Sequence, residues 1–263
     1  MILTQTLHVM RSHHLPFFQL ALFLVLVFGG CNVVGQTPEK GFKTIFDGKT
    51  LNGWDGNPTY WRVENGNLVG EITPVTLLKT NSFIIWKGGQ PADFELKGEV
   101  NITANGNSGI NYRSERLPDV PFALRGYQAD IDGANRYTGQ NYEERGRTTL
   151  AYRGQITSIN PQSGTSTPEA LRAKVKNNAW TDLKITGSLG NTDSLKTNIK
   201  TEDWNTFHLV IKGNRLLHYV NGVLMSDVTD NDLINGKSKG FLGVQVHVGP
   251  PMQVKYRNLR LKE

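Results

Sequence analysis

The chain has 263 residues, of which 38% are hydrophobic and 20% are charged, and its formal net charge is +6. This composition is ordinary for a globular protein, and the length suits one large all-β domain or two smaller domains. The positive excess is mild and contains no Lys/Arg run or basic-aromatic alternation, so nothing in the sequence indicates nucleic-acid binding.

Residues 1–30 have the pattern of an export signal. One charged residue, Arg11, precedes a largely apolar run over residues 15–28. This run is short for a transmembrane helix and suits the core of a signal peptide. The Gly-Gly-Cys that follows resembles the cleavage box of bacterial lipoproteins, with Cys31 as the lipidated first residue. A plain secretory signal is the alternative.

Cys31 is the only cysteine, so no internal disulfide is expected. Asn32 follows it, where an Asp would suggest retention in the inner membrane. We expect an exported lipoprotein, facing the periplasm or in the outer membrane, that touches the membrane only through its N-terminal lipid. Residues 31–40 would be a tether and residues 41–263 a single folded domain. Met10 is an alternative start of the chain.

The first part of the folded domain predicts short strands joined by tight turns. We expect strands at residues 42–46, 60–63, 67–70, 82–86 and 93–102. Asn65-Gly66, between the second and third of these, is the strongest short signal of a hairpin. Over 93–102 apolar and polar residues alternate, with Gly98 in one inward position.

Residues 107–147 concentrate specific polar groups. Because side chains alternate along a strand, Tyr127, Ala129 and Ile131 would share a core face. The opposite face of this strand and of two others would carry Gln128, Asp130 and Asp132, then Asn111 and Arg113, then Gln245 and His247. A solvated outer face explains any one such strand. Three together predict a site.

After residue 147 the pattern weakens and then recovers. Residues 160–167 predict a loop, and Thr167-Pro168 predicts the start of a helix reaching residue 176, with a second helix over 192–200. Further strands are expected at 148–152, 206–212, 216–220, 223–225, 240–248 and 252–261. Roughly 13 or 14 strands without a repeating βα pattern indicate an all-β sandwich or barrel.

Several chemical motifs are absent from the sequence. It contains no Gly-rich phosphate loop, no His-Glu-x-x-His, no cysteine cluster and no nucleophile elbow, which is a Gly-x-Ser-x-Gly turn leading from a strand into a helix. This argues against nucleotide chemistry, zinc proteolysis and serine acyl transfer. Carboxylates and amides near aromatic rings suit a sugar, whose hydroxyls accept and donate hydrogen bonds while its apolar face packs on a ring.

Motifs in a fixed order extend this interpretation. They lie at residues 46–54 (Phe-Asp-Gly-Lys-Thr-Leu-Asn-Gly-Trp), 93–96, 106–110, 126–131, 203–205, 221–222, 245–251 and 257–259. Together they resemble the 3-keto-disaccharide hydrolase domain family over residues 41–262. The resemblance implies a concanavalin A-like jelly roll of two stacked, curved antiparallel sheets. It also implies hydrolysis of glycosides already oxidised at the sugar C3. Residues 171–185 look longer than is usual in the family.

Roles for the polar residues follow from their chemistry and from the resemblance. Asp130 and Glu143 are the leading acid/base pair, since Tyr142-Glu143 matches the Tyr-Glu pattern of the family, and Glu144 is the less favoured partner. His247 is a candidate acid or base because its ordinary pKa lies near neutrality. Its alternative is a structural histidine held by Gln245 or Arg113. The residues assigned to substrate binding are Asn111, Arg113, Gln128, Asp132, Tyr142, Arg147 and Gln245.

The sequence also allows interpretations other than an enzyme. A non-catalytic carbohydrate-binding module has the same fold class. Asp130 and Asp132 are also suited to hold Ca²⁺, although no cofactor is expected for the hydrolase. A 3-keto substrate would need an upstream oxidoreductase. Its carbonyl would acidify the C2 proton, allowing elimination and rehydration in place of the usual two-carboxylate displacement.

Overall fold

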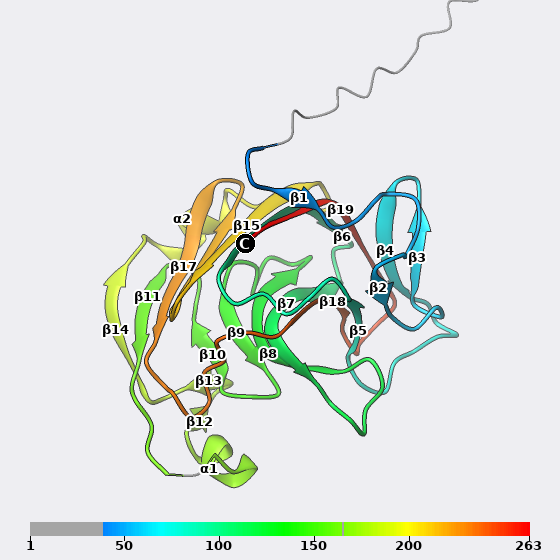
Figure 1. Ribbon diagram of the computed structural model, residues 1–263. Coiled ribbons are helices and arrows are strands. Elements are labelled where there is room, and N and C mark those ends of the chain that lie inside the picture. Colours follow the sequence, from blue (N-terminus) through cyan, green and yellow to red (C-terminus); the bar gives the residue numbers. More distant parts are fainter. Residues whose placement is uncertain (1–38, 165) are drawn as a thin grey trace, which may run out of the picture. The chain divides into compact units, whose positions relative to one another are not determined.

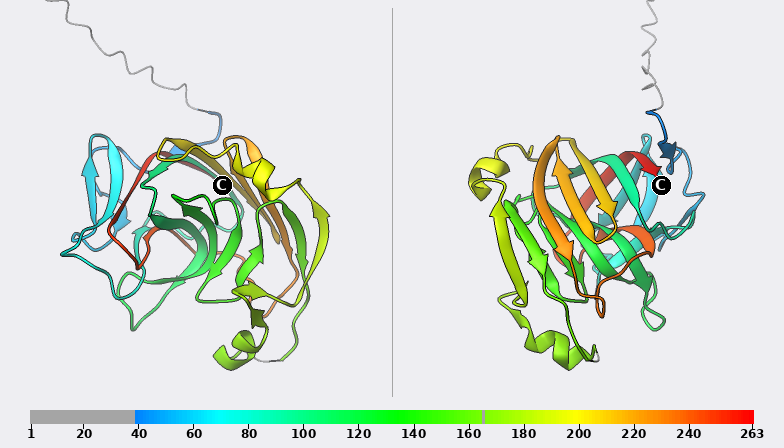
Figure 2. Two further views of the ribbon diagram at one scale, coloured as in Figure 1. Left: turned by 180° about the vertical axis from the view of Figure 1, so that it is seen from behind. Right: turned by 60° about the vertical axis from the view of Figure 1, so that its left-hand side comes forward.

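Alternating apolar residues bring two β-sheets face to face in the computed structural model, which describes residues 39–164 and 166–263 (Figure 1, Figure 2). The first sheet contains β1 (Lys43–Thr44), β3 (Trp61–Glu64), β4 (Asn67–Ile72), β6 (Phe94–Ile102), β11 (Gln155–Ile159), β14 (Leu183–Ser188), β15 (Asn205–Lys212), β16 (Arg215–Val220), β17 (Val223–Asp230) and β19 (Met252–Lys262). The second contains β2 (Trp54–Asp55), β5 (Ser82–Trp86), β7 (Asn107–Arg116), β8 (Leu124–Asp132), β9 (Asn141–Glu144), β10 (Thr148–Ala151), β12 (Val175–Lys176), β13 (Ala179–Trp180) and β18 (Phe241–Val246). The predicted jelly roll of two stacked sheets is confirmed.

The direction of some strands differs from the expected antiparallel arrangement. The first sheet runs β14-β11-β17-β16-β15-β6-β19-β4-β3, with β1 paired to β19, and the second runs β12-β13-β10-β9-β8-β7-β18-β5-β2. The sheets are not purely antiparallel, because β11 runs parallel to β17 and β10 runs parallel to β13. These pairs arise where the chain passes from the second sheet to the first between β10 and β11.

The core lies between the sheets. Each sheet contributes its apolar face, with Leu96 and Phe207 on one side and Ile110 and Tyr127 on the other, all at most 5% exposed. Each such side chain stabilises the fold by about 1.5–3 kcal/mol relative to an exposed position. Gly98 does face inward as predicted, and a Cβ there would lie 2.5 Å from Cζ of Phe207. The ring therefore occupies the space of a side chain.

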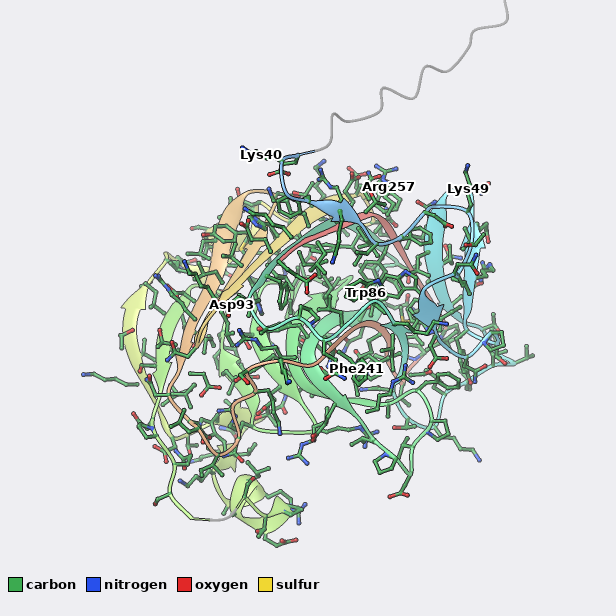
Figure 3. All side chains as sticks on the ribbon, viewed as in Figure 1. Lys40, Lys49, Trp86, Asp93, Phe241 and Arg257 are labelled. Carbon is green, nitrogen blue, oxygen red and sulfur yellow. The ribbon has the colours of Figure 1, made fainter. Side chains whose placement is uncertain are left out.

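The side chains labelled in Figure 3 illustrate which residues lie in the interior and which lie at the surface. Figure 3 places Trp86, at the end of β5, near the centre of the molecule and Lys49 and Arg257 at its periphery. Trp86 is 6% exposed.

The predicted turns and helices are largely present. Asn65 and Gly66 have φ of +50° and +78° and join β3 to β4, as the hairpin signal requires. Thr167 caps α1 (Pro168–Ala173) by accepting a hydrogen bond from the Ala170 nitrogen at 3.1 Å. The helix α2 (Thr192–Lys196) is shorter than expected, with Asn191 as its cap. No helix within residues 39–164 and 166–263 is long and apolar enough to cross a membrane.

Short strands account for what the sequence pattern missed. The two-residue strands β2, β12 and β13 and the strands β9, β11 and β14 lack a clear alternation and were not predicted, which is why 19 strands are found in the described residues against the smaller number expected. The predicted signal peptide, Cys31 and all but the last two residues of the tether lie outside the described residues.

Candidate active site

A cavity of about 230 Å³ opens on the face of the second sheet that points away from the first. Its lining residues are Asn107, Gln128, Asp130, Tyr137, Gln140, Tyr142, Glu144, Asn178 and His247. Strand register explains the grouping. Gln128 of β8 lies directly opposite Tyr142 of β9, so Asp130 and Glu144, each two residues further along its strand, share the same face.

Asp130 is one of two buried acids of this cavity, at 8% exposed. Its two oxygens accept hydrogen bonds of 2.5 Å from Nε2 of Gln128 and Nε2 of Gln140. Burial raises the pKa of the Asp130 carboxyl to about 7; these amide bonds oppose the rise and the nearby Glu144 adds to it. Both protonation states are therefore populated near neutrality, as a general acid or base requires.

Glu144 is the second carboxyl of the cavity. Its Oε1 accepts a hydrogen bond from Nδ2 of Asn81 at 3.0 Å, and Nε of Arg145 lies 3.8 Å away. Burial raises the pKa of Glu144, while Asn81, Arg145 and His247 act to lower it. The cavity thus holds two carboxyls whose pKa values are both above the ordinary range.

His247 lies just beyond the end of β18 and lines the same cavity, as predicted. Its Nδ1 is 2.6 Å from the carbonyl oxygen of Val248. A carbonyl oxygen only accepts hydrogen bonds, so Nδ1 carries the proton and Nε2 is the basic nitrogen of the neutral ring.

Glu143 does not lie beside Asp130, and the expectation that it would was wrong. In the strand register Glu143 is opposite Tyr127, whose side chain belongs to the core face. Its Oε2 accepts hydrogen bonds from the backbone nitrogen of Arg147 at 2.7 Å and from Nε of Arg147 at 2.6 Å. Glu144, the less favoured candidate, takes its place in the cavity.

The two arginines assigned to the substrate are also elsewhere. Arg147 is fully buried, with Nη2 2.7 Å from Oδ2 of Asp230. Arg113 lies within a β-bulge and has φ of +45°, which turns its side chain away from Asn111. It donates to the carbonyl of Gly213 at 2.7 Å and lines a separate cavity of about 390 Å³.

Asp132 supports the cavity without entering it. Its carboxylate accepts hydrogen bonds from the backbone nitrogens of Arg136, Tyr137 and Thr138, at 2.7–3.1 Å. These bonds hold the loop that brings Tyr137 to the cavity. Both oxygens of Asp132 accept hydrogen bonds from this loop, and the Ca²⁺ alternative stays a prediction. Within the described part of the chain no three His, Cys, Asp or Glu side chains are grouped as metal ligands.

Asn111 and Gln245 lie on the predicted face but beneath the cavity. Both are 0% exposed, and neither belongs to its lining. Gln245 donates to Oε1 of Gln128 at 3.3 Å, and Gln128 in turn donates to Asp130. Gln245 therefore orients Gln128, and Asn111 packs opposite Gln128 in the neighbouring strand.

The sequence analysis did not assign four of the lining residues to the site, namely Asn107, Tyr137, Gln140 and Asn178. Gln140 directly precedes β9, and Asn178 sits in the turn between β12 and β13 with φ of +58°. Neither belongs to an alternating strand. Asn178 reaches the cavity region because its carbonyl accepts a hydrogen bond from the Thr149 nitrogen at 3.2 Å, beside the parallel pair of β10 and β13.

The chain matches one family model in sequence and several solved structures in fold. Residues 41–262 match the model of the 3-keto-alpha-glucoside-1,2-lyase-like domain. A 3-keto-disaccharide hydrolase of Bacteroides thetaiotaomicron is 24% identical over 252 residues, which cover 84% of this chain and 78% of that protein. Two crystal structures of candidate glycosyl hydrolases from Parabacteroides distasonis share the fold. Their TM-scores are 0.51 and 0.50 at 16% and 18% identity, and both cover 84% of this chain, with 98% and 93% of the respective relative covered.

Proposed function

Because the chain belongs to the 3-keto-alpha-glucoside-1,2-lyase-like family, we propose that it is a hydrolase that cleaves the glycosidic bond of 3-keto-glycosides. The observation that carries the proposal is the pair of buried carboxyls, Asp130 and Glu144, on one cavity beside His247. A binding module would need aromatic rings and amides, but not two carboxyls with raised pKa values.

The proposed reaction begins at C2 of the oxidised sugar. The C3 carbonyl acidifies the C2 proton, so a base removes it and the electron pair forms an enolate. The enolate expels the C1 oxygen, which takes a proton from an acid and leaves as the free aglycone. Water then adds at C1 while a proton returns to C2, so the net change is hydrolysis. Elimination across C1 and C2 agrees with the words "1,2-lyase" in the family description.

Residues of the cavity can fill each role. Asp130 or Nε2 of His247 is the base, and Glu144, whose raised pKa favours the protonated form, is the acid for the leaving oxygen. Arg113 and Glu143 have no part in this assignment. Gln128 and Gln140 each donate one amide hydrogen to Asp130 and retain a second, which we assign to the enolate oxygen.

The sugar itself would contact the remaining lining residues. Tyr137 and Tyr142 offer aromatic faces for the apolar side of the ring, and Asn107 and Asn178 offer amides for its hydroxyls. A 3-keto sugar arises by oxidation of a C3 hydroxyl, so we also propose that a sugar oxidoreductase acts upstream.

Incubation in heavy water tests the reaction. The enzyme is given a 3-keto-glycoside and the released 3-keto sugar is analysed early, beside an enzyme-free control that measures exchange in solution. Deuterium at C2 ahead of the control is expected. Retention of the original proton would leave direct displacement, and an equal rate on the unoxidised glycoside would refute the 3-keto requirement. Binding without turnover would favour the carbohydrate-binding module.

We further propose that the protein is an exported lipoprotein, facing the periplasm or in the outer membrane. The support is the sequence of residues 1–30 and the single cysteine at position 31. Cys31→Ala should move the protein from the membrane pellet to the soluble fraction. A soluble wild-type protein with a free amino terminus would overturn the anchor.

A further inference from the structure

One buried amide, that of Asn81, joins the two chain segments that carry Glu144 and His247. Asn81 directly precedes β5 and is 9% exposed. Its Nδ2 donates to Oε1 of Glu144 at 3.0 Å, and its Oδ1 accepts from the Val248 nitrogen at 2.9 Å. Both ends of the amide are hydrogen-bonded, one to Glu144 of the cavity wall and the other to Val248, the residue after His247.

The contact with Val248 extends to the histidine. The carbonyl of Val248 accepts the hydrogen bond from Nδ1 of His247. Both backbone groups of Val248 are therefore engaged, one by Asn81 and the other by the imidazole. This matters because β18 ends at Val246: beyond it the His247 nitrogen donates to the carbonyl of Asn107 at 3.3 Å, and the Val248 nitrogen is held by Asn81.

In the described structure the Asn81 amide makes these two hydrogen bonds and no others. Its two hydrogen bonds go to residues 63 and 167 positions away in the sequence, and not to its own strand or turn. A buried polar side chain is costly unless it is hydrogen-bonded, so an apolar residue would serve equally well if only packing mattered. The presence of an amide here matches what Glu144 and Val248 require.

We propose that Asn81 is a positioning residue that fixes the Glu144 carboxyl and, through Val248, the tautomer and orientation of His247. This role rests on the proposed function, in which Glu144 gives a proton to the leaving oxygen. Asn81 touches neither the reacting sugar nor the water, so its effect passes through the two titratable groups.

The substitution Asn81→Asp tests this proposal with little change in shape. The new carboxylate still accepts from the Val248 nitrogen, but it replaces the donor facing Glu144 with a like charge, which disfavours ionisation of Glu144. The alkaline limb of kcat/KM, set by loss of the proton from Glu144, should move up by about one pH unit. Asn81→Ala, which adds no charge, should lower kcat about tenfold with little change in KM.

A matched control is present in the chain. Asn235 is 8% exposed, and its Nδ2 donates to Oδ2 of the buried Asp232 at 2.6 Å, outside the candidate cavity. Asn235→Asp makes the same chemical change at the same degree of burial. It should lower the melting temperature and leave the pH profile where it is in the wild-type protein.

A spectroscopic measurement does not depend on activity. With ¹⁵N-labelled histidine, and His247→Gln to assign the signal, the wild-type His247 ring should carry its proton on Nδ1, and Asn81→Ala should mix the two tautomers. An unchanged tautomer, together with an alkaline limb of Asn81→Asp that coincides with the wild type, would overturn the positioning role. Wild-type protein that does not act on 3-keto-glycosides would instead refute the proposed function, and the tautomer measurement would still decide the role of Asn81.

Discussion

The buried Asp130 carboxyl should make the folded protein less stable as the pH rises from about 4 to about 7, and Asp130→Asn should remove this dependence. Burial raises the pKa of Asp130 in the folded protein from its ordinary value of 3.8 to about 7. Between these values the unfolded chain has lost a proton that the folded chain keeps. The unfolded state then binds fewer protons, so stability falls with rising pH.

The size of the effect follows from the shift in pKa. A rise in the pKa from 3.8 to about 7 lowers the free energy of unfolding above pH 7 by at most about 4 kcal/mol. For a domain of this size that is on the order of 10 °C in melting temperature. The amide introduced by Asp130→Asn offers one oxygen to two amide donors, so Gln128 or Gln140 must turn its own amide at a cost of about 1 kcal/mol. This cost is the same at every pH and cancels in the comparison.

Thermal unfolding at pH 4.5 and pH 8 measures the effect. The melting temperature of Asp130→Asn minus that of the wild type should be markedly larger at pH 8. Asp119→Asn, at an exposed position, should show no such trend. A difference that is equal at both pH values would mean that Asp130 ionises at its ordinary pKa, and the reasoning would fail. The same variant should lose about 10²–10⁴-fold in kcat/KM if Asp130 transfers a proton.

Three further changes test other parts of the site. Glu143→Gln should destabilise the protein by about 3 kcal/mol, because Arg147 loses a buried partner, and should leave kcat/KM of the folded protein unchanged. Glu144→Gln should lower kcat/KM and leave the stability nearly unchanged. Melting curves and initial rates of the two variants test both expectations. Gly109→Ala places a Cβ 2.4 Å from Cδ of Gln128 and should lower kcat/KM about tenfold by displacing that amide; full activity would show that Gln128 is dispensable. A chelator should leave the rate unchanged, since the cavity's side chains supply acid and base, whereas a loss reversed by added divalent cation would assign a metal to the site.

Alternation predicted the site wherever the strands are regular. Gln128 and Asp130 face the cavity because β8 keeps its period of two to its end. The same rule separates Tyr142 from Glu143, since neighbours in a strand point to opposite faces. The resemblance to a Tyr-Glu motif outweighed that rule and led to the wrong glutamate. Strand parity alone favours Glu144.

The other wrong predictions of side-chain position have causes that cannot be read from the sequence. Arg113 leaves the polar face because of a bulge, and nothing in residues 107–116 marks its position. Arg147 goes inward because Asp230 lies opposite it, 83 positions along the chain. Asn178 joins the cavity through a parallel strand pair that depends on where the chain changes sheets. Each of these depends on contacts between distant residues.

The composition of the cavity bears on the mechanism. No Lys or Arg is among the residues that line it in the described structure, so an enolate oxygen formed there would meet hydrogen-bond donors without a permanent cation. Two ionised carboxylates would repel that oxygen. The pKa of about 7 at Asp130 keeps a proton in the site near neutral pH, and burial shifts the pKa of Glu144 in the same direction, so this repulsion is reduced. An oxocarbenium-like state is positive and gains from ionised carboxylates, so the same burial would oppose direct displacement. The electrostatics of the cavity therefore favour the proposed proton abstraction at C2, with a rate that falls at alkaline pH as Glu144 loses the proton that it gives to the leaving oxygen.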